Sequence, residues 1–316
     1  MSKPHILVAR KIFPEVIERL TQHFEVYANQ DDNLWTQAEL IERLQGKDGA
    51  LLTGTQPVNA ELLAACPQLP TVMLAAMTAA GVQGTNTPDV LTETTADFGF
   101  ALLMATARRI TESEHYLRAG QWTRWSYDMF AGCEVHGSTL GILGMGRIGQ
   151  GIAKRGAHGF GMNVIYHNRS RLSPALEAEC KARYVGKDEL LAQADHLVLV
   201  LPYTPESHHA IGAAEIARMK PTATLINIAR GGIVDDAALA QALKERRIAA
   251  AGLDVFEGEP AVHPALLEVP NVVLTPHIAS ATVPTRLAMA QLAADNLVAF
   301  FDGRGALTPV NTPAKV

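Results

Sequence analysis

Two kinds of apolar pattern alternate along this chain of 316 residues. Short, mostly β-branched runs predict strands, and segments with apolar residues every three or four positions predict helices. In the first part we expect strands at His5–Arg10, Phe24–Tyr27, Ala50–Thr53 and Thr71–Ala75, and helices at Pro14–His23, Thr36–Leu44 and Asn59–Ala65. This alternation is typical of a parallel sheet that is covered by helices on both faces.

A second set of strands follows a long helical pattern at Thr92–Ala119, which we interpret as a spine that joins two lobes. These strands are expected at Thr139–Leu143, Asn163–Tyr166, Leu197–Leu201, Thr224–Ile228, Ala249–Asp254 and Asn271–Thr275. The segment Thr285–Asp302 is helical again. The two sets predict an α/β fold of two doubly wound, parallel-sheet (Rossmann-like) domains with the active site in the cleft between them.

The composition narrows the class of protein. Hydrophobic residues make up 48% of the chain and charged residues 19%, which indicates a packed protein rather than a disordered one. No apolar run is long enough for a bilayer, and the start lacks the apolar stretch of a signal peptide. The three cysteines are too few and too scattered for a disulfide framework or a zinc site. We expect a cytoplasmic protein, and the net charge of −5 argues against nucleic-acid binding.

The most informative motif is a glycine pattern, Gly144-Met145-Gly146-Arg147-Ile148-Gly149, which follows an apolar strand and opens a helix. Gly144 permits a tight turn, Gly146 lets a pyrophosphate approach the backbone, and Gly149 lets the helix pack on the strand. The free N–H groups at the start of the helix then hold the phosphates. In this context the pattern predicts a dinucleotide site.

The end of the next strand indicates which dinucleotide is bound. An acidic residue about 20 positions after the glycines would hold the ribose 2′-hydroxyl of NAD. This chain instead has Asn168-Arg169-Ser170-Arg171 there. Guanidinium groups suit a 2′-phosphate, so we expect NADP(H) to be preferred, with NAD(H) possible. The alternative is that both arginines only solvate a turn.

Three residues at the ends of later strands suggest catalysis. Arg230 follows a buried strand, where a guanidinium needs an anionic partner such as a substrate carboxylate. His277 follows another strand, and Glu259 lies in the loop after the strand between them. Either residue alone is more often structural than catalytic. Together, the three supply a cation for a carboxylate, an acid for a developing alkoxide, and a carboxylate that orients the imidazole. Asp235 is better explained as a helix N-cap.

These motifs, in this order and over nearly the whole chain, resemble the D-isomer-specific 2-hydroxyacid dehydrogenases. LTETTADFGFALLMATARRI and YHNRSR most resemble the glyoxylate/hydroxypyruvate and 2-ketogluconate reductase branch. The resemblance implies reduction of a small 2-oxo acid to the D-2-hydroxy acid. It also implies that Arg230 binds the substrate carboxylate, that His277 is the general acid/base and that Glu259 is the partner of His277.

The resemblance further implies cofactor contacts and a domain assignment. The cofactor contacts would be Asp254, Ile228 and Ala229 near the nicotinamide, and Pro202 and Thr204 on the adenosine side. Residues 1–97 with 287–316 would form the substrate-binding domain, and residues 98–286 the dinucleotide-binding domain. The family also implies a homodimer whose partner is clasped by the segment 122–130. Four aromatic residues in that short irregular stretch support an interface, although a cluster packed on its own subunit is the alternative.

One departure from the family concerns its substrate loop. Relatives carry a Val-Gly-Tyr-Asn-Asn-type loop, which is missing between Thr71 and Val90. If Thr71–Ala75 and Val82–Thr85 were parallel neighbours, their connection should need about a dozen residues. Only Ala76–Gly81 is available. Either the lobe is rearranged and substrate binding is weakened, or the printed sequence omits a loop here. We favour the second explanation, because the family pattern resumes directly after the gap.

Two classes of protein other than an enzyme are also compatible with these motifs. A dinucleotide-sensing regulator or a catalytically silent binding protein could use the same fold, and turnover of a 2-oxo acid separates both from an enzyme. No metal site is expected. His208 and His209 are adjacent and should point apart on any regular element, and no carboxylate cluster accompanies them in the sequence.

Overall fold

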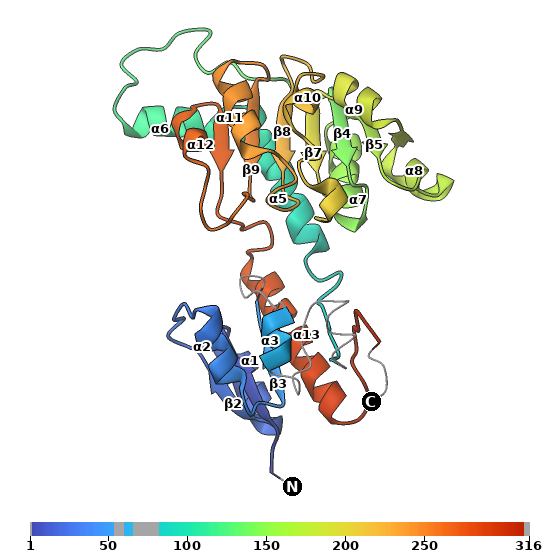
Figure 1. Cartoon of the computed structure of the whole chain (residues 1–316). Coiled ribbons are helices and arrows are strands. Elements are labelled where there is room, and N and C mark those ends of the chain that lie inside the picture. Colours follow the sequence, from blue (N-terminus) through green and yellow to red (C-terminus); the bar gives the residue numbers. More distant parts are fainter. Residues whose placement is uncertain (1, 54–59, 66–81, 313–316) are drawn as a thin grey trace. The chain divides into compact units, whose positions relative to one another are not determined.

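The computed structural model describes residues 2–53, 60–65 and 82–312 (Figure 1). The chain divides into two compact units, Met1–Leu91 with Thr282–Val316, and Thr92–Ala281. The limits expected from the sequence, after residues 97 and 286, fall inside helices α5 (Thr92–Ala107) and α13 (Val283–Phe301). Each of these helices belongs whole to one unit. The binding roles expected for the two units stay predictions.

The first unit is built on a parallel sheet of strand order β2-β1-β3 in the part of the chain that the structure describes. Its elements are β1 (His5–Val8), α1 (Pro14–His23), β2 (Glu25–Ala28), α2 (Gln37–Leu44), β3 (Gly49–Leu51), α3 (Ala60–Ala65) and α13. Side chains of β1 alternate between two apolar clusters. Ile6 and Val8 pack with residues of α1 and α13, and Leu7 packs with residues of α2. Both faces of the sheet are therefore covered, as the apolar runs predict.

The second unit contains a sheet of seven parallel strands in the order β10-β9-β8-β7-β4-β5-β6. The strands are β4 (Thr139–Leu143), β5 (Asn163–His167), β6 (Ala182–Tyr184), β7 (His196–Leu199), β8 (Thr224–Asn227), β9 (Ala250–Leu253) and β10 (Val272–Leu274). The chain moves outward from β4 to β6, then returns to the other side of β4 with β7. Ligands of such folds bind at this reversal, outside the carboxyl ends of the strands. The edge strand β6 was not expected from the sequence.

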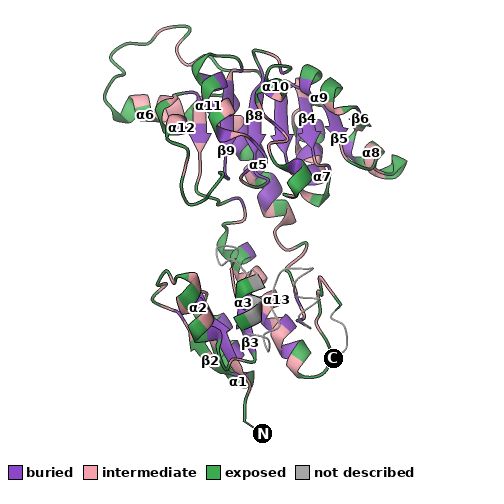
Figure 2. Ribbon diagram, viewed as in Figure 1, coloured by how far each residue is buried: buried purple, intermediate pink, exposed green. Residues whose placement is uncertain are grey.

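Helices cover both faces of this sheet, and Figure 2 shows its strands as a buried layer. The remaining helical elements are α6 (Ile110–Arg118), α7 (Arg147–Lys154), a π-helical turn (Arg155–Gly159), α8 (Pro174–Cys180), α9 (Lys187–Gln193), a 3-10 turn (Pro205–Ser207), α10 (Ala213–Ile216), α11 (Asp236–Lys244) and α12 (Pro264–Glu268). Along β7, Val198 packs on the α5 side, whereas Leu197 and Leu199 pack on the opposite side with residues of α9 and α11. The two-residue period of a strand thus supplies two apolar cores.

The long helix expected at Thr92–Ala119 is broken, and both resulting helices, α5 and α6, lie in the second unit. Arg109, between them, has left-handed backbone with φ 53°. The carbonyl oxygen of Ala107 accepts a hydrogen bond of 2.8 Å from the N–H of Cys133. That contact replaces a bond within the helix and ends α5.

Expectations for the segment near residue 76 are tested only in part. The strand predicted at Thr71–Ala75 and the connection Ala76–Gly81 lie outside the described residues. Val82–Thr85 is not a strand, since Thr85 forms an isolated antiparallel bridge with Pro309. Among the described helices, none is both long and apolar enough to cross a membrane.

His196, the first residue of β7, gives the second unit a predictable response to pH. It is fully buried, and its ring nitrogens lie 2.8 Å from Thr224 Oγ1 and 3.0 Å from the carbonyl oxygen of Glu134. Burial lowers the pKa of His196 below its ordinary value of 6.5. The unfolded chain therefore binds this proton more readily, so the free energy of unfolding should fall as the pH drops below about 6.5.

Urea denaturation at about pH 7.5 and about pH 5.5 measures this effect. The substitution His196→Gln should reduce the difference in unfolding free energy between the two pH values. His115→Gln, which removes a histidine that is 79% exposed, should leave the difference unchanged. An equal pH dependence in the wild type and in His196→Gln would contradict the assignment.

Candidate active site

The residues that the sequence assigns to catalysis and cofactor binding lie at or just after the carboxyl ends of strands in the second unit. The glycine motif follows β4, Asn168–Arg171 follows β5, and Pro202 and Thr204 follow β7. Arg230 follows β8, the segment Asp254–Glu259 follows β9, and His277 follows β10. Because the strands are parallel, all these segments emerge at the same edge of the sheet. The three candidate catalytic residues come from neighbouring strands.

The glycine turn between β4 and α7 has the shape that a pyrophosphate needs. Gly144 has φ +104°, and an added Cβ would lie 2.6 Å from the backbone of Val200. An added Cβ on Gly149 would lie 2.5 Å from the carbonyl oxygen of Gly144. At Gly146, by contrast, a Cβ would meet nothing within 4 Å, and no side chain caps the helix there. Without a side chain at Gly146, and with Ile148 only partly buried, the start of α7 leaves room for a phosphate to approach the backbone.

Asn168 supports this turn from the end of β5. Its Oδ1 accepts a hydrogen bond of 2.6 Å from the N–H of Met145, in the middle of the glycine motif. The side chain therefore holds the turn in place. A carboxylate at this position would accept the same bond but would repel a 2′-phosphate.

The two arginines after Asn168 differ in their surroundings. Arg171 donates two hydrogen bonds, of 2.8 and 2.7 Å, to the carboxylate of Glu177, which also accepts a bond from the Tyr166 hydroxyl. Arg169 and Ser170 are exposed. A backbone hydrogen bond, a side-chain bond from Thr204 and the charge of Arg169 together lower the pKa of Glu206. The structure thus pairs Arg171 within the protein and leaves Arg169 facing the loop after β7.

That loop and the end of β8 hold the remaining cofactor candidates. Pro202 is exposed and Thr204 is partly exposed. The Ser207 hydroxyl accepts from the N–H of Thr204 at 2.7 Å and contacts the Pro202 carbonyl oxygen at 3.1 Å, which fixes the loop. Ile228 and Ala229 are buried, at 6% and 4% exposure, so only their backbone could line a cofactor site.

Arg230 is exposed immediately after this buried segment. Its Nη1 donates a 2.6 Å hydrogen bond to the carbonyl oxygen of Ala229. Asn227 accepts from the N–H of Ala229 at 3.1 Å and donates to the carbonyl oxygen of Arg230 at 3.4 Å, so it positions the turn. Within the described ranges, Arg230 forms no ion pair with a carboxylate. Its guanidinium is therefore suited to an anion from outside the protein.

His277 and Glu259 are brought together as the sequence suggested. His277 Nδ1 lies 2.7 Å from Glu259 Oε2, and Glu259 Oε1 accepts a hydrogen bond of 2.8 Å from the N–H of Phe256. The carboxylate is thus held in place on one side and orients the imidazole on the other. Since 51% of the His277 side chain is exposed, its Nε2 is free to exchange a proton with a ligand.

Asp254 lies beneath this pair and is fully buried. Its carboxylate accepts hydrogen bonds from the N–H groups of Ile278 and Ala279, both at 2.8 Å, and from the Thr275 hydroxyl at 2.7 Å. Its own carbonyl oxygen accepts from the N–H of His277 at 2.9 Å. The structure therefore gives Asp254 a positioning role, and its expected contact with the cofactor stays a prediction.

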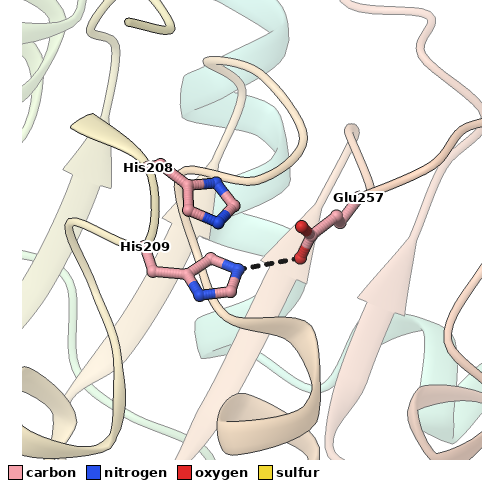
Figure 3. A group of neighbouring side chains, drawn as sticks. All are labelled: His208, His209 and Glu257. Atoms are coloured by element: carbon pink, nitrogen blue, oxygen red, sulfur yellow. Dashed lines mark hydrogen bonds and ion pairs between the residues drawn. The ribbon is translucent and has the colours of Figure 1, made fainter. Parts of the chain in front are cut away.

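The expectation that His208 and His209 point apart is wrong. Their rings stack with centroids 3.9 Å apart, and Glu257 Oε2 lies 2.9 Å from Nε2 of His209 (Figure 3). His209 has left-handed backbone with φ 49°, which breaks the alternation of an extended chain and turns both rings to one side. No spacing in the sequence reveals Glu257, because it approaches from the loop after β9. The role of Asp235 as N-cap is confirmed, since its side chain accepts from the N–H of Ala238 at 3.0 Å.

Comparisons with known proteins agree with this architecture. The family model described as "D-isomer specific 2-hydroxyacid dehydrogenase, NAD binding domain" matches residues 100–279. The chain is 45% identical, over 323 aligned positions, to a glyoxylate reductase of Thermococcus onnurineus, with 98% of this chain and 96% of the relative covered. Because 323 positions exceed the 316 residues of this chain, the relative has residues without a counterpart here.

Two solved structures are similar over nearly their whole length. A D-isomer specific 2-hydroxyacid dehydrogenase from Polaromonas has a TM-score of 0.89 and 34% identity, with 98% of this chain and 99% of that chain covered. The NADPH-dependent glyoxylate/hydroxypyruvate reductase of Sinorhizobium meliloti, in complex with NADP and malonate, has a TM-score of 0.86 and 38% identity. The match covers 98% of this chain and 97% of that chain. The chain therefore belongs to the D-isomer specific 2-hydroxyacid dehydrogenases and is an NAD(P)-dependent oxidoreductase that reduces a small 2-oxo acid.

Proposed function

We propose that this chain reduces glyoxylate, hydroxypyruvate or 2-ketogluconate to the D-2-hydroxy acid, with NADPH preferred over NADH. The observation that carries the proposal is the 2.7 Å contact between His277 and Glu259, at the sheet edge that also presents Arg230 and the glycine turn. The names of the relatives, glyoxylate reductase among them, support a small 2-oxo acid as substrate.

Substrate binding is assigned to Arg230. A planar guanidinium can hold a carboxylate through two parallel hydrogen bonds, which fixes both the position and the orientation of the acid. The 2-oxo group is bonded to the carboxylate carbon, so fixing the carboxylate also fixes the ketone oxygen. Arg230 thus lowers the entropy cost of bringing the carbonyl to the catalytic groups.

Proton transfer is assigned to Nε2 of His277. A bound nicotinamide cofactor would supply a hydride, and His277 would give its proton to the carbonyl oxygen as negative charge develops there. Glu259 stabilises the imidazolium and holds the ring with Nδ1 toward itself. In the direction of oxidation, the same nitrogen would accept the hydroxyl proton.

The experiment that tests this function follows the absorbance of NADPH, with NADH in parallel, in the presence of each of the three acids. We expect rapid NADPH oxidation with at least one acid. His277→Gln should lower kcat by about 100-fold or more, because it removes general acid catalysis. Cofactor affinity should change little, since His277 is not part of the glycine turn.

Glu259→Gln is the matched variant, because it keeps the size of the side chain but loses its charge. We expect an intermediate loss of kcat, as the imidazolium would be less well stabilised. Wild-type turnover in His277→Gln would overturn the catalytic assignment. Tight cofactor binding without oxidation of NADPH or NADH in the wild type would instead favour a dinucleotide sensor or a silent binding protein.

The preference for NADPH is assigned mainly to Arg169. The 2′-phosphate carries negative charge, and Arg169 is exposed after β5, whereas Arg171 is paired with Glu177. Asn168 at the start of this segment brings no repulsive charge. Ser170, which is exposed between the arginines, adds a small hydrogen-bond donor.

Substitution of the two arginines separates their roles. Arg169→Ala should lower kcat/KM for NADPH by about 10-fold or more, since a charge-assisted hydrogen bond contributes about 1.5–3 kcal/mol. The value of kcat/KM for NADH should remain nearly unchanged. Arg171→Ala is the matched control and should have a smaller effect on the ratio of NADPH to NADH efficiency. A larger effect from Arg171→Ala would reverse the assignment.

A homodimer is proposed from the segment between α6 and β4, which loops away from the sheet of its unit (Figure 1). Trp122, Trp125 and Tyr127 are 52%, 70% and 93% exposed. Phe130, at the base of the segment, packs against Tyr116 within the same chain, with ring centroids 5.2 Å apart. Three large exposed rings beside an anchored one fit an interface with a second copy.

Light scattering of the purified chain should give the mass of a dimer. Replacing Trp122, Trp125 and Tyr127 together by Ser should give the mass of a monomer, because the rings would supply most of the apolar interface. Leu34→Ser is the matched control, since Leu34 is 81% exposed in the first unit, and the dimer should persist. A monomeric wild type would contradict the proposal.

A further inference from the structure

Three side chains outside the proposed catalytic set converge above the carboxyl edge of the second sheet. His208 and His209 come from the loop after β7, and Glu257 comes from the loop after β9 (Figure 3). One nitrogen from each imidazole and one carboxylate oxygen lie within 4.8 Å of one another. The two rings are stacked at an interplanar angle of 22°, and Nε2 of His209 lies 2.9 Å from the carboxylate of Glu257.

The other ring nitrogen of each histidine already faces a hydrogen-bonding group. Nδ1 of His208 lies 3.1 Å from the hydroxyl of Tyr203. Nδ1 of His209 lies 3.9 Å from the carboxylate of Asp235, which is an ion-pair distance rather than a hydrogen bond. Nε2 of His209 is directed toward Glu257, and the contact with Tyr203 leaves Nε2 of His208 available to a ligand. Metal-binding histidines almost always have such a partner on the second nitrogen, because it fixes the tautomer and the direction of the ring.

The chemistry of the three groups selects a class of metal ion. Two imidazoles and a carboxylate suit Zn²⁺, Ni²⁺ or Cu²⁺, whereas Mg²⁺ and Ca²⁺ prefer sites made of oxygen atoms. With bonds of about 2.1 Å, the ligand atoms of a tetrahedral zinc site lie roughly 3.3 Å apart. The ligand atoms here lie within 4.8 Å of one another, so binding would require the exposed side chains of His208 and Glu257 to rotate toward the ion.

We propose that His208, His209 and Glu257 form a binding site for a divalent transition-metal ion of the Zn²⁺ class, with water in the fourth position. The hydroxyl of Tyr203 orients the imidazole of His208. The site is separate from the proposed catalytic residues, and its existence does not depend on the proposed reaction.

Such an ion would connect two loops that carry other candidate site residues. The loop after β7 includes Thr204, and Glu257 lies two residues before Glu259. Between these loops lies the turn after β8, where the carbonyl oxygen of Gly232 accepts a hydrogen bond of 2.7 Å from the N–H of His209. A metal ion that binds only to the folded chain would stabilise this edge of the sheet.

Isothermal titration calorimetry of the untagged chain with ZnCl₂ tests the site. We expect about one equivalent to bind, and MgCl₂ to give no binding heat. Glu257→Gln keeps the shape of the side chain, and His209→Asn retains a residue that tolerates left-handed backbone. Each should weaken Zn²⁺ binding by at least about 10-fold. Tyr203→Phe, which removes only the orienting hydroxyl, should weaken it by about 10-fold.

The matched control is His115→Gln. His115 has a carboxylate neighbour, Glu114, at 4.0 Å, but among the described residues it belongs to no group that could hold a metal ion, so its loss should not change Zn²⁺ binding. A second measurement does not need any variant: hydrogen exchange in the loops after β7 and β9 should slow when Zn²⁺ is added. Absence of Zn²⁺ binding, or wild-type affinity in both Glu257→Gln and His209→Asn, would overturn the proposal.

Discussion

The arrangement of the candidate active site depends on the buried carboxylate of Asp254. It accepts three hydrogen bonds from the segment after β10, and its backbone carbonyl oxygen accepts a fourth from His277. A buried carboxylate without partners would destabilise the fold, so the loop is held wherever its donors meet this acceptor. His277 is therefore directed toward Glu259 by interactions beneath it. The orientation of the imidazole is set before any ligand arrives, which is what preorganised catalysis requires.

The parallel sheet explains why distant residues can act together. Arg230, Glu259 and His277 are separated along the sequence, yet they follow neighbouring strands β8, β9 and β10. The dinucleotide candidates follow β4, β5 and β7 at the same edge. Asn168 and Asn227 serve a similar purpose in the two halves, because the side-chain oxygen of each accepts a hydrogen bond from a backbone N–H of a functional turn.

Much of this could be predicted from the sequence because strands and glycine turns depend on local patterns. The strand ends and the glycine motif located the candidate residues, and the order of the motifs indicated the family. Apart from the pairing of His277 with Glu259, contacts between distant segments could not be predicted. The helix break at Arg109 follows from a bond between Ala107 and Cys133, and the pairing of Arg171 depends on Glu177. The stacking of His208 on His209 depends on one left-handed residue that no apolar pattern reports.

The two edge strands of the second sheet bear on how copies of the chain meet. An exposed strand edge invites pairing with another chain, which leads to uncontrolled aggregation. Here β6 and β10 are only three residues long. The exposed Arg183 lies in β6, and Pro270 and Pro276, which have no N–H to donate, stand on either side of β10. Extension of this sheet from one chain to the next is therefore disfavoured at both edges. The proposed contact between two copies would then depend on side chains, whose shape and chemistry can restrict the assembly to one defined partner.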